Sequence, residues 1–203
     1  MSSIKDFLGN MPLTVDAYWA LRGRHKPWNA HYELAGLKDV LPEAVEDALK
    51  YRREAERPRK ICMFATLHYW IEQAMLVGLG LAGYGHRVSF AWLPYAEWDQ
   101  EISQFDLRRQ DLYTRDVLQT ASRVMRIGGL LDPGLQTGSK LNLTPELQKI
   151  VDQVSDYDTQ YTLQIEETDL SSPLCLLRQR RNGQAARAIY DWLKAEKPDL
   201  LVI

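Results

Sequence analysis

Three short, largely apolar runs stand out along this chain, and longer amphipathic stretches separate them. The runs cover residues 61–65, 88–93 and 200–203. Runs of this kind are typical of strands that are buried on both faces of a parallel sheet. Residues 71–82 lie between the first two runs, are largely apolar and end just before Gly83, which predicts a helix. The pattern therefore predicts a strand–helix–strand unit with parallel strands.

Helical spacing of apolar residues continues downstream. It predicts helices over residues 103–127, from Thr144 onward and over residues 172–196, the last with a possible interruption at Asn182-Gly183. A short alternation over residues 161–165 predicts a strand with one covered face. The sequence thus predicts an α/β fold, with a Rossmann-like parallel sheet flanked by helices.

The chain is expected to divide into two parts. Residues 1–58 form a predicted N-terminal helical extension, in which Pro42 opens a helix, and residues 59–203 form the predicted Rossmann-like domain. In such a domain the loop after a parallel strand carries function, and the sequence ends on the strand over residues 200–203. We expect these residues to be the front part of a longer protein, incomplete at the C-terminus. The alternative is that this strand closes a complete small domain.

Composition narrows the function classes. The formal net charge of −2 argues against a nucleic-acid-binding face spread over the whole molecule. The N-terminus lacks the apolar core of a signal peptide, and the longest apolar stretch, residues 74–82, is too short to span a bilayer. Cys62 and Cys175 match no metal-ligand spacing and are expected to be reduced and buried. We expect a cytoplasmic protein, with a peripheral membrane contact left open.

Several nucleotide-binding and catalytic motifs are absent. The first strand is followed by ATLHYWIEQ, which lacks the glycines of G-x-G-x-x-G, and the chain contains neither a P-loop motif nor a G-x-S-x-G elbow. The sequence therefore predicts no bound cofactor.

Ligands of open α/β sheets bind at the carboxyl ends of the strands. Thr66 and His68 follow the first predicted strand, and Glu97, Asp99 and Glu101 form an acidic patch after the second. The acidic patch could contact a sugar or a cation, or it could be an exposed loop.

One family resemblance adds to these predictions. An apolar strand over residues 61–66, His68 in the following loop, a helix over residues 71–82 and the element Gly85-His86-Arg87-Val88 before the second strand occur in this order. With the helix and strand over residues 185–203, the pattern resembles the N-terminal domain of GT-B-fold glycosyltransferases. The resemblance covers roughly residues 60–93 and 172–203.

The resemblance implies that this half binds a hydroxyl acceptor, while a C-terminal domain missing from this sequence binds a nucleotide sugar, so the fragment alone is expected to be inactive. His68 would be the general base, since an imidazole can accept a proton near neutral pH. Thr66 and Glu97 would contact the acceptor. Alternatively, His68 caps the following helix. Two other functions stay open: a non-catalytic ligand- or partner-binding module, and half of a GT-B-like nucleotide-sugar epimerase.

Two further charged clusters are assigned no function. Asp156 and Asp158 match the D-x-D spacing by which GT-A enzymes hold a divalent metal, but a solvated turn is the favoured interpretation, and no metal site is predicted. Arg178, Arg180 and Arg181 are expected to form the solvated face of a helix.

Overall fold

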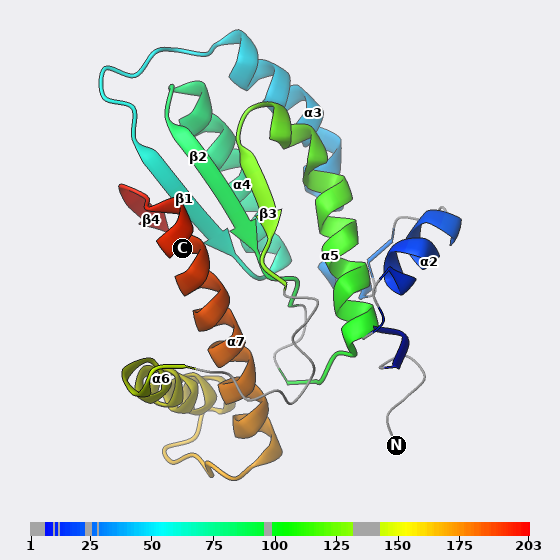
Figure 1. Cartoon of the computed structure of the whole chain (residues 1–203), viewed down its shortest axis with the longest axis vertical. Coiled ribbons are helices and arrows are strands. Elements are labelled where there is room, and N and C mark those ends of the chain that lie inside the picture. Colours follow the sequence, from blue (N-terminus) through cyan, green and yellow to red (C-terminus); the bar gives the residue numbers. More distant parts are fainter. Residues whose placement is uncertain are drawn as a thin grey trace.

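The computed structural model describes residues 7–9, 11, 13–22, 26–27, 29–95, 99–131 and 143–203. The strands within these ranges form one parallel sheet in the order β3-β2-β1-β4 (Figure 1). Their bounds are β1 (Lys60–Ala65), β2 (Arg87–Trp92), β3 (Arg126–Gly129) and β4 (Leu200–Val202). A parallel sheet flanked by helices confirms the predicted α/β, Rossmann-like fold.

Helices cover both faces of the sheet. Helix α4 packs directly on β1 and β2, α3 packs on α4, and α7 lies on the opposite face (Figure 1). The helix bounds are α2 (Thr14–Arg22), α3 (Ala35–Lys50), α4 (His68–Gly83), α5 (Gln104–Leu118), α6 (Pro145–Leu163) and α7 (Pro173–Glu196), with the 3-10 helices η1 (Ala30–Tyr32) and η2 (Gln119–Arg123). The chain builds β1, β2 and β3 outward in one direction and then returns to place β4 on the other side of β1.

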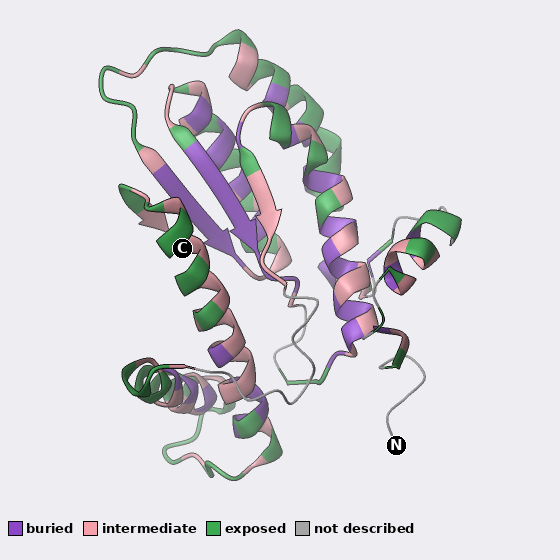
Figure 2. Cartoon of the chain, in the orientation of Figure 1, coloured by how far each residue is buried: buried purple, intermediate pink, exposed green. Residues whose placement is uncertain are grey.

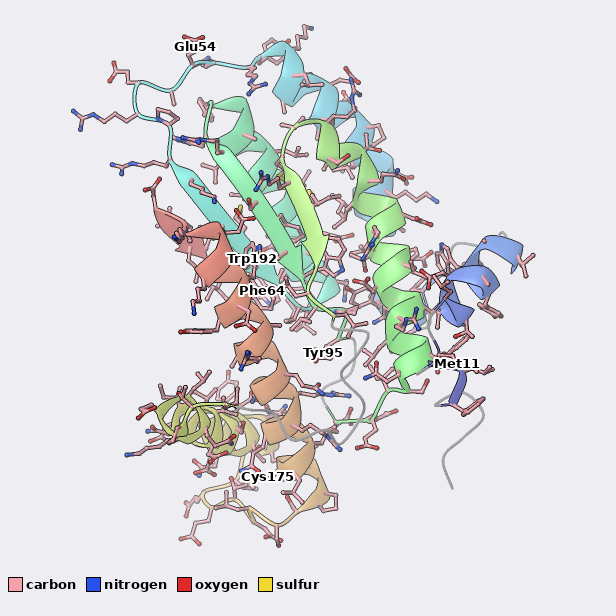
Figure 3. All side chains as sticks on the ribbon, in the orientation of Figure 1. Met11, Glu54, Phe64, Tyr95, Cys175 and Trp192 are labelled. Atoms are coloured by element: carbon pink, nitrogen blue, oxygen red, sulfur yellow. The ribbon has the colours of Figure 1, made fainter. Side chains whose placement is uncertain are left out.

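Alternate side chains of the strands enter two apolar clusters, as the period of a strand requires. Ile61 and Met63 join the larger cluster, which α3, α4 and α5 complete. Phe64 joins the smaller cluster, where it packs with Trp192 of α7 (Figure 3). The central strands are therefore buried on both faces (Figure 2), which explains why their runs are apolar apart from Ser89.

Helix α3 begins earlier than predicted. It starts at Ala35, so Pro42 lies inside the helix instead of opening it. Leu37, Leu41 and Val45 share one face of the helix and are all buried. Burial of this face against the core outweighs the backbone hydrogen bond that Pro42 removes.

The prediction of one helix over residues 103–127 was wrong at its end. Helix α5 stops at Leu118, η2 follows, and residues 126–129 form the edge strand β3 beside β2. Two of the four residues of β3 are glycines, which weaken the usual strand signal.

The strand predicted over residues 161–165 was also wrong. Tyr161 and Leu163 belong to the last turn of α6, and Gln164 ends the helix in a left-handed conformation with φ of 56°. The helix starts at Thr144 and Ser172 are confirmed, because each side chain accepts a hydrogen bond from the backbone N–H three residues on. Helix α7 runs through Asn182-Gly183 without interruption.

Both cysteines are confirmed as free and buried.

Candidate functional site

The strand order creates a switch point at the carboxyl edge of the sheet. The chain leaves β1 toward β2 on one side, and β4 pairs with β1 on the other side. The helices of the two connections, α4 and α7, lie on opposite faces of the sheet, and ligands of open α/β sheets bind at the strand ends beside such a switch point. The candidate site therefore comprises the residues that follow β1 and β2.

The residues after β1 place an aromatic group at this edge. Thr66 is half-buried just after the strand, and His68 is half-buried at the first position of α4. The His68 ring meets the Tyr69 ring edge-on at 5.2 Å between centroids, and the Tyr69 ring lies 5.3 Å from that of Trp70. Tyr69 and Trp70 are exposed. The start of α4 thus presents an imidazole beside two aromatic faces that a ligand can reach.

Side chains of α5 fix the end of β2. Trp92, the last residue of the strand, donates its indole N–H to Asp111 Oδ1 at 2.9 Å. Gln110 donates its side-chain N–H to the Pro94 carbonyl at 2.9 Å. Because Gln110 and Asp111 are buried, these bonds are shielded from water and fix the positions of Trp92 and Pro94.

A narrow cleft with a volume of about 30 Å³ opens between Tyr95, the segment 101–107 and α7. The Arg181 guanidinium lies over the Tyr95 ring at 5.6 Å and donates to the Gln100 carbonyl. The Tyr95 hydroxyl donates to Gln184 Oε1 at 3.3 Å. The lining residues are Tyr95, Glu101, Ile102, Gln104, Leu107, Leu177, Arg180, Arg181 and Gln184.

Burial tunes the polar groups of this cleft. Desolvation raises the pKa of the Tyr95 phenol to about 12, so it stays a neutral hydrogen-bond donor at physiological pH. Desolvation also lowers the pKa of Arg181, although a guanidinium remains charged near neutral pH. A cationic fork beside a phenol and two amide side chains can hydrogen-bond an anionic or hydroxyl group that is small enough to enter this narrow cleft.

The structure therefore brings Thr66 and His68 to the predicted edge. Glu97 lies outside the described residues. Of the acidic patch, Glu101 lines the cleft and forms an ion pair with Arg180.

The prediction for the three arginines of α7 was wrong. Arg178 is buried and forms an ion pair with Asp158, while Arg180 and Arg181 line the cleft. A signal for Arg181 was present in the sequence. Its position continues the apolar stripe of α7 that packs on the sheet, which includes Ala185, Ile189 and Trp192.

The D-x-D pair lies on a helix, not in the expected turn. Asp156 and Asp158 are both on α6, where Asp156 accepts a hydrogen bond from Gln160 at 3.2 Å and Asp158 pairs with Arg178. Over the ranges described above, no group of three or more His, Cys, Asp or Glu side chains is arranged to hold a metal ion.

Comparison with known proteins gave no match among family models, curated proteins or solved structures. Among the described helices, none combines the length and the apolar character that crossing a membrane requires.

Proposed function

We propose that this chain is the acceptor-binding half of a glycosyltransferase, which moves a sugar from a nucleotide sugar to a hydroxyl acceptor. The position of His68 carries the proposal. It lies at the first residue of α4, directly after the central strand β1 and beside the switch point of the sheet. A general base must reach the hydroxyl proton that it removes, and this edge is where an α/β sheet receives its ligand.

The neighbouring aromatic side chains support a sugar-containing acceptor. Tyr69 and Trp70 are exposed next to His68, and an aromatic face can pack on the apolar C–H face of a sugar ring. Thr66, half-buried at the end of β1, is close enough in the chain to orient an acceptor hydroxyl. Under this proposal the nucleotide sugar is held by a second Rossmann-like domain and the reaction occurs between the two.

The test has a binding arm and a turnover arm. Binding of a panel of glycosides and other hydroxyl compounds to this chain is measured by calorimetry, with Trp70→Ala as the variant and Tyr84→Ala as its control. Tyr84 is an exposed aromatic residue at the opposite end of α4. We expect Trp70→Ala to weaken acceptor binding about 10-fold, and Tyr84→Ala to leave it unchanged.

Turnover is measured on the longest open reading frame that contains this sequence, with a panel of nucleotide sugars. We expect His68→Ala to lower kcat about 10²- to 10⁴-fold while acceptor affinity changes little. Full kcat in His68→Ala would remove the histidine from the mechanism.

A non-catalytic ligand-binding module is the second candidate, and the cleft at the end of β2 favours it. The cleft offers Arg181, Tyr95 and Gln184 as recognition groups without depending on His68. Binding of an anionic ligand that is lost in Arg181→Gln, combined with no nucleotide-sugar turnover by any reading frame containing the sequence, would favour the module over the enzyme.

A further inference from the structure

Helix α6 buries its small side chains and exposes its large ones. Among the described elements it packs extensively only on α7, and it lies with the N-terminal part of α7 beyond the carboxyl end of the sheet (Figure 1). Its contact face contains Val151, Ser155 and Thr159, all buried. The hydroxyls of Ser155 and Thr159 donate to backbone carbonyls one turn earlier, each at 2.6 Å. This face therefore contributes little apolar burial for a helix of 19 residues.

The outer side of α6 is exposed and carries large apolar and aromatic side chains (Figure 2). We define the α6 seam as Leu147, Ile150, Val154, Tyr157 and Tyr161. These positions alternate in steps of three and four residues, which is the a/d spacing of a coiled coil. Leu147 is half-buried, and the other four side chains are between 50% and 80% exposed. The two tyrosines alone leave about 250 Å² of side chain open to water.

A continuous apolar seam of this kind marks an interaction surface. We propose that the α6 seam is where two copies of this chain associate, with α6 packed antiparallel on α6 of the second copy. This inference does not depend on the proposed function, because it uses a different helix and none of the residues assigned to the acceptor.

Self-complementarity of the seam favours a second copy. In an antiparallel pair one register places Val154 opposite Tyr157 of the second copy and Ile150 opposite Tyr161, and the two-fold axis repeats both layers. Each of the four layers then combines a β-branched side chain with an aromatic ring. Such small-with-large pairing lets the helices approach without leaving a void.

The uncharged polar side chains beside the seam are compatible with this partner. Gln153 and Gln160 flank the seam on its open side, and in the antiparallel register they meet each other as neutral amides. The antiparallel helix dipoles also attract one another.

A membrane surface fits less well. Helix α6 contains four acidic residues and a single lysine, Lys149, whereas helices that lie on anionic bilayers carry lysines and arginines on their polar face.

The size of the seam sets the expected affinity. Its five side chains can bury about 400 Å² per chain, half of the roughly 800 Å² per partner of a standard stable interface. We therefore expect a reversible dimer with a dissociation constant of micromolar order.

Sedimentation equilibrium over about 1–200 µM protein tests the proposal, a range chosen to bracket micromolar affinity. The variants are Tyr157→Glu and Val154→Lys on the seam, and the control is Tyr51→Glu. Tyr51 at the end of α3 is 62% exposed, against 59% for Tyr157, so the control matches both residue type and exposure. Circular dichroism checks that each variant is folded. Flotation with anionic vesicles of phosphatidylserine and phosphatidylcholine tests the membrane alternative.

We expect the wild type and Tyr51→Glu to dimerise alike. Each seam variant should raise the dissociation constant about 100-fold, because the dimer contains every substitution twice. A wild type that stays monomeric over the whole range overturns the proposal. A dimer that persists in both folded seam variants also overturns it. The same holds if the protein is monomeric and binds vesicles in a way that Tyr157→Glu abolishes.

Discussion

Two adjacent glycines of β3 provide a sharp test of how the end of β2 is held. A side chain at position 128 and one at position 129 would point to opposite faces of the sheet, because successive residues of a strand alternate. A methyl group at Gly128 would have no heavy atom within 4 Å. A methyl group at Gly129 would lie 3.0 Å from Asp111 Cγ and well inside the contact distance of its Oδ1. Gly129→Ala therefore requires Asp111 to move, whereas Gly128→Ala does not.

The expected cost follows from the partners that Asp111 would lose. Trp92 is fully buried, so its indole N–H would be left without an acceptor, at a cost of about 1–3 kcal/mol. The ion pair between Asp111 and Arg115, 3.0 Å long, would also break, but Arg115 is largely exposed and the pair contributes less than about 1 kcal/mol. We expect Gly129→Ala to lower the free energy of unfolding by about 2–3 kcal/mol and Tm by roughly 6 °C. Gly128→Ala should change stability by less than about 1 kcal/mol, in the stabilising direction.

Guanidinium chloride unfolding of both variants measures the difference, and a double-mutant cycle locates its cause. In an Asp111→Ala background the clash is gone, so Gly129→Ala should then cost less than about 0.5 kcal/mol. Equal losses in Gly128→Ala and Gly129→Ala would refute the argument. The same conclusion would follow if the cost of Gly129→Ala were unchanged in the Asp111→Ala background.

Three further predictions concern other parts of the fold. A hydrogen bond from Lys60 lowers the pKa of Glu196, so the ionised carboxylate stabilises the fold above its ordinary pKa, and this stability is lost as the pH falls through the lower folded pKa. Glu196→Gln should therefore lower the free energy of unfolding by about 0.5–1 kcal/mol at pH 7. Chemical denaturation should show the difference in stability between wild type and variant disappearing below about pH 4. Burial raises the pKa of Cys62 to about 11 and also raises the pKa of Cys175. Iodoacetamide at pH 8 should therefore label both thiols quickly only in denaturant. Rapid labelling of the folded protein would contradict their burial. Ser172→Ala removes the N-cap of α7 and should lower the free energy of unfolding by about 1 kcal/mol, whereas Ser172→Asp should retain most of it.

Sequence reasoning succeeded where the local signal and the tertiary environment agree. Strands β1 and β2 are buried on both faces, so after the first residue of each strand they are apolar apart from Ser89. The N-caps Thr144 and Ser172 use a local side-chain hydrogen bond that three residues of sequence can encode. Strand β3 was missed because its existence depends on pairing with β2, and its two glycines carry no strand preference of their own.

The candidate site also has parts that the sequence predicts and parts that it does not. The positions of Thr66 and His68 follow from the end of β1, which the apolar run defines. The cleft at Tyr95 could not be predicted in this way, because it requires Arg181 of α7 to meet a loop 86 residues earlier in the chain, and no local pattern encodes that contact.

The hydrogen bond between Trp92 and Asp111 also separates the two candidate functions of this edge. Trp92 ends β2 only three residues before Tyr95, whereas His68 and Trp70 follow a different strand. Loss of Asp111 frees the end of β2 and should therefore disturb the cleft at Tyr95 more than the start of α4. If Asp111→Ala weakens ligand binding as strongly as Arg181→Gln does, the ligand occupies the cleft. If binding instead responds to Trp70→Ala and tolerates Asp111→Ala, the ligand lies beside His68, where an acceptor for glycosyl transfer would have to be.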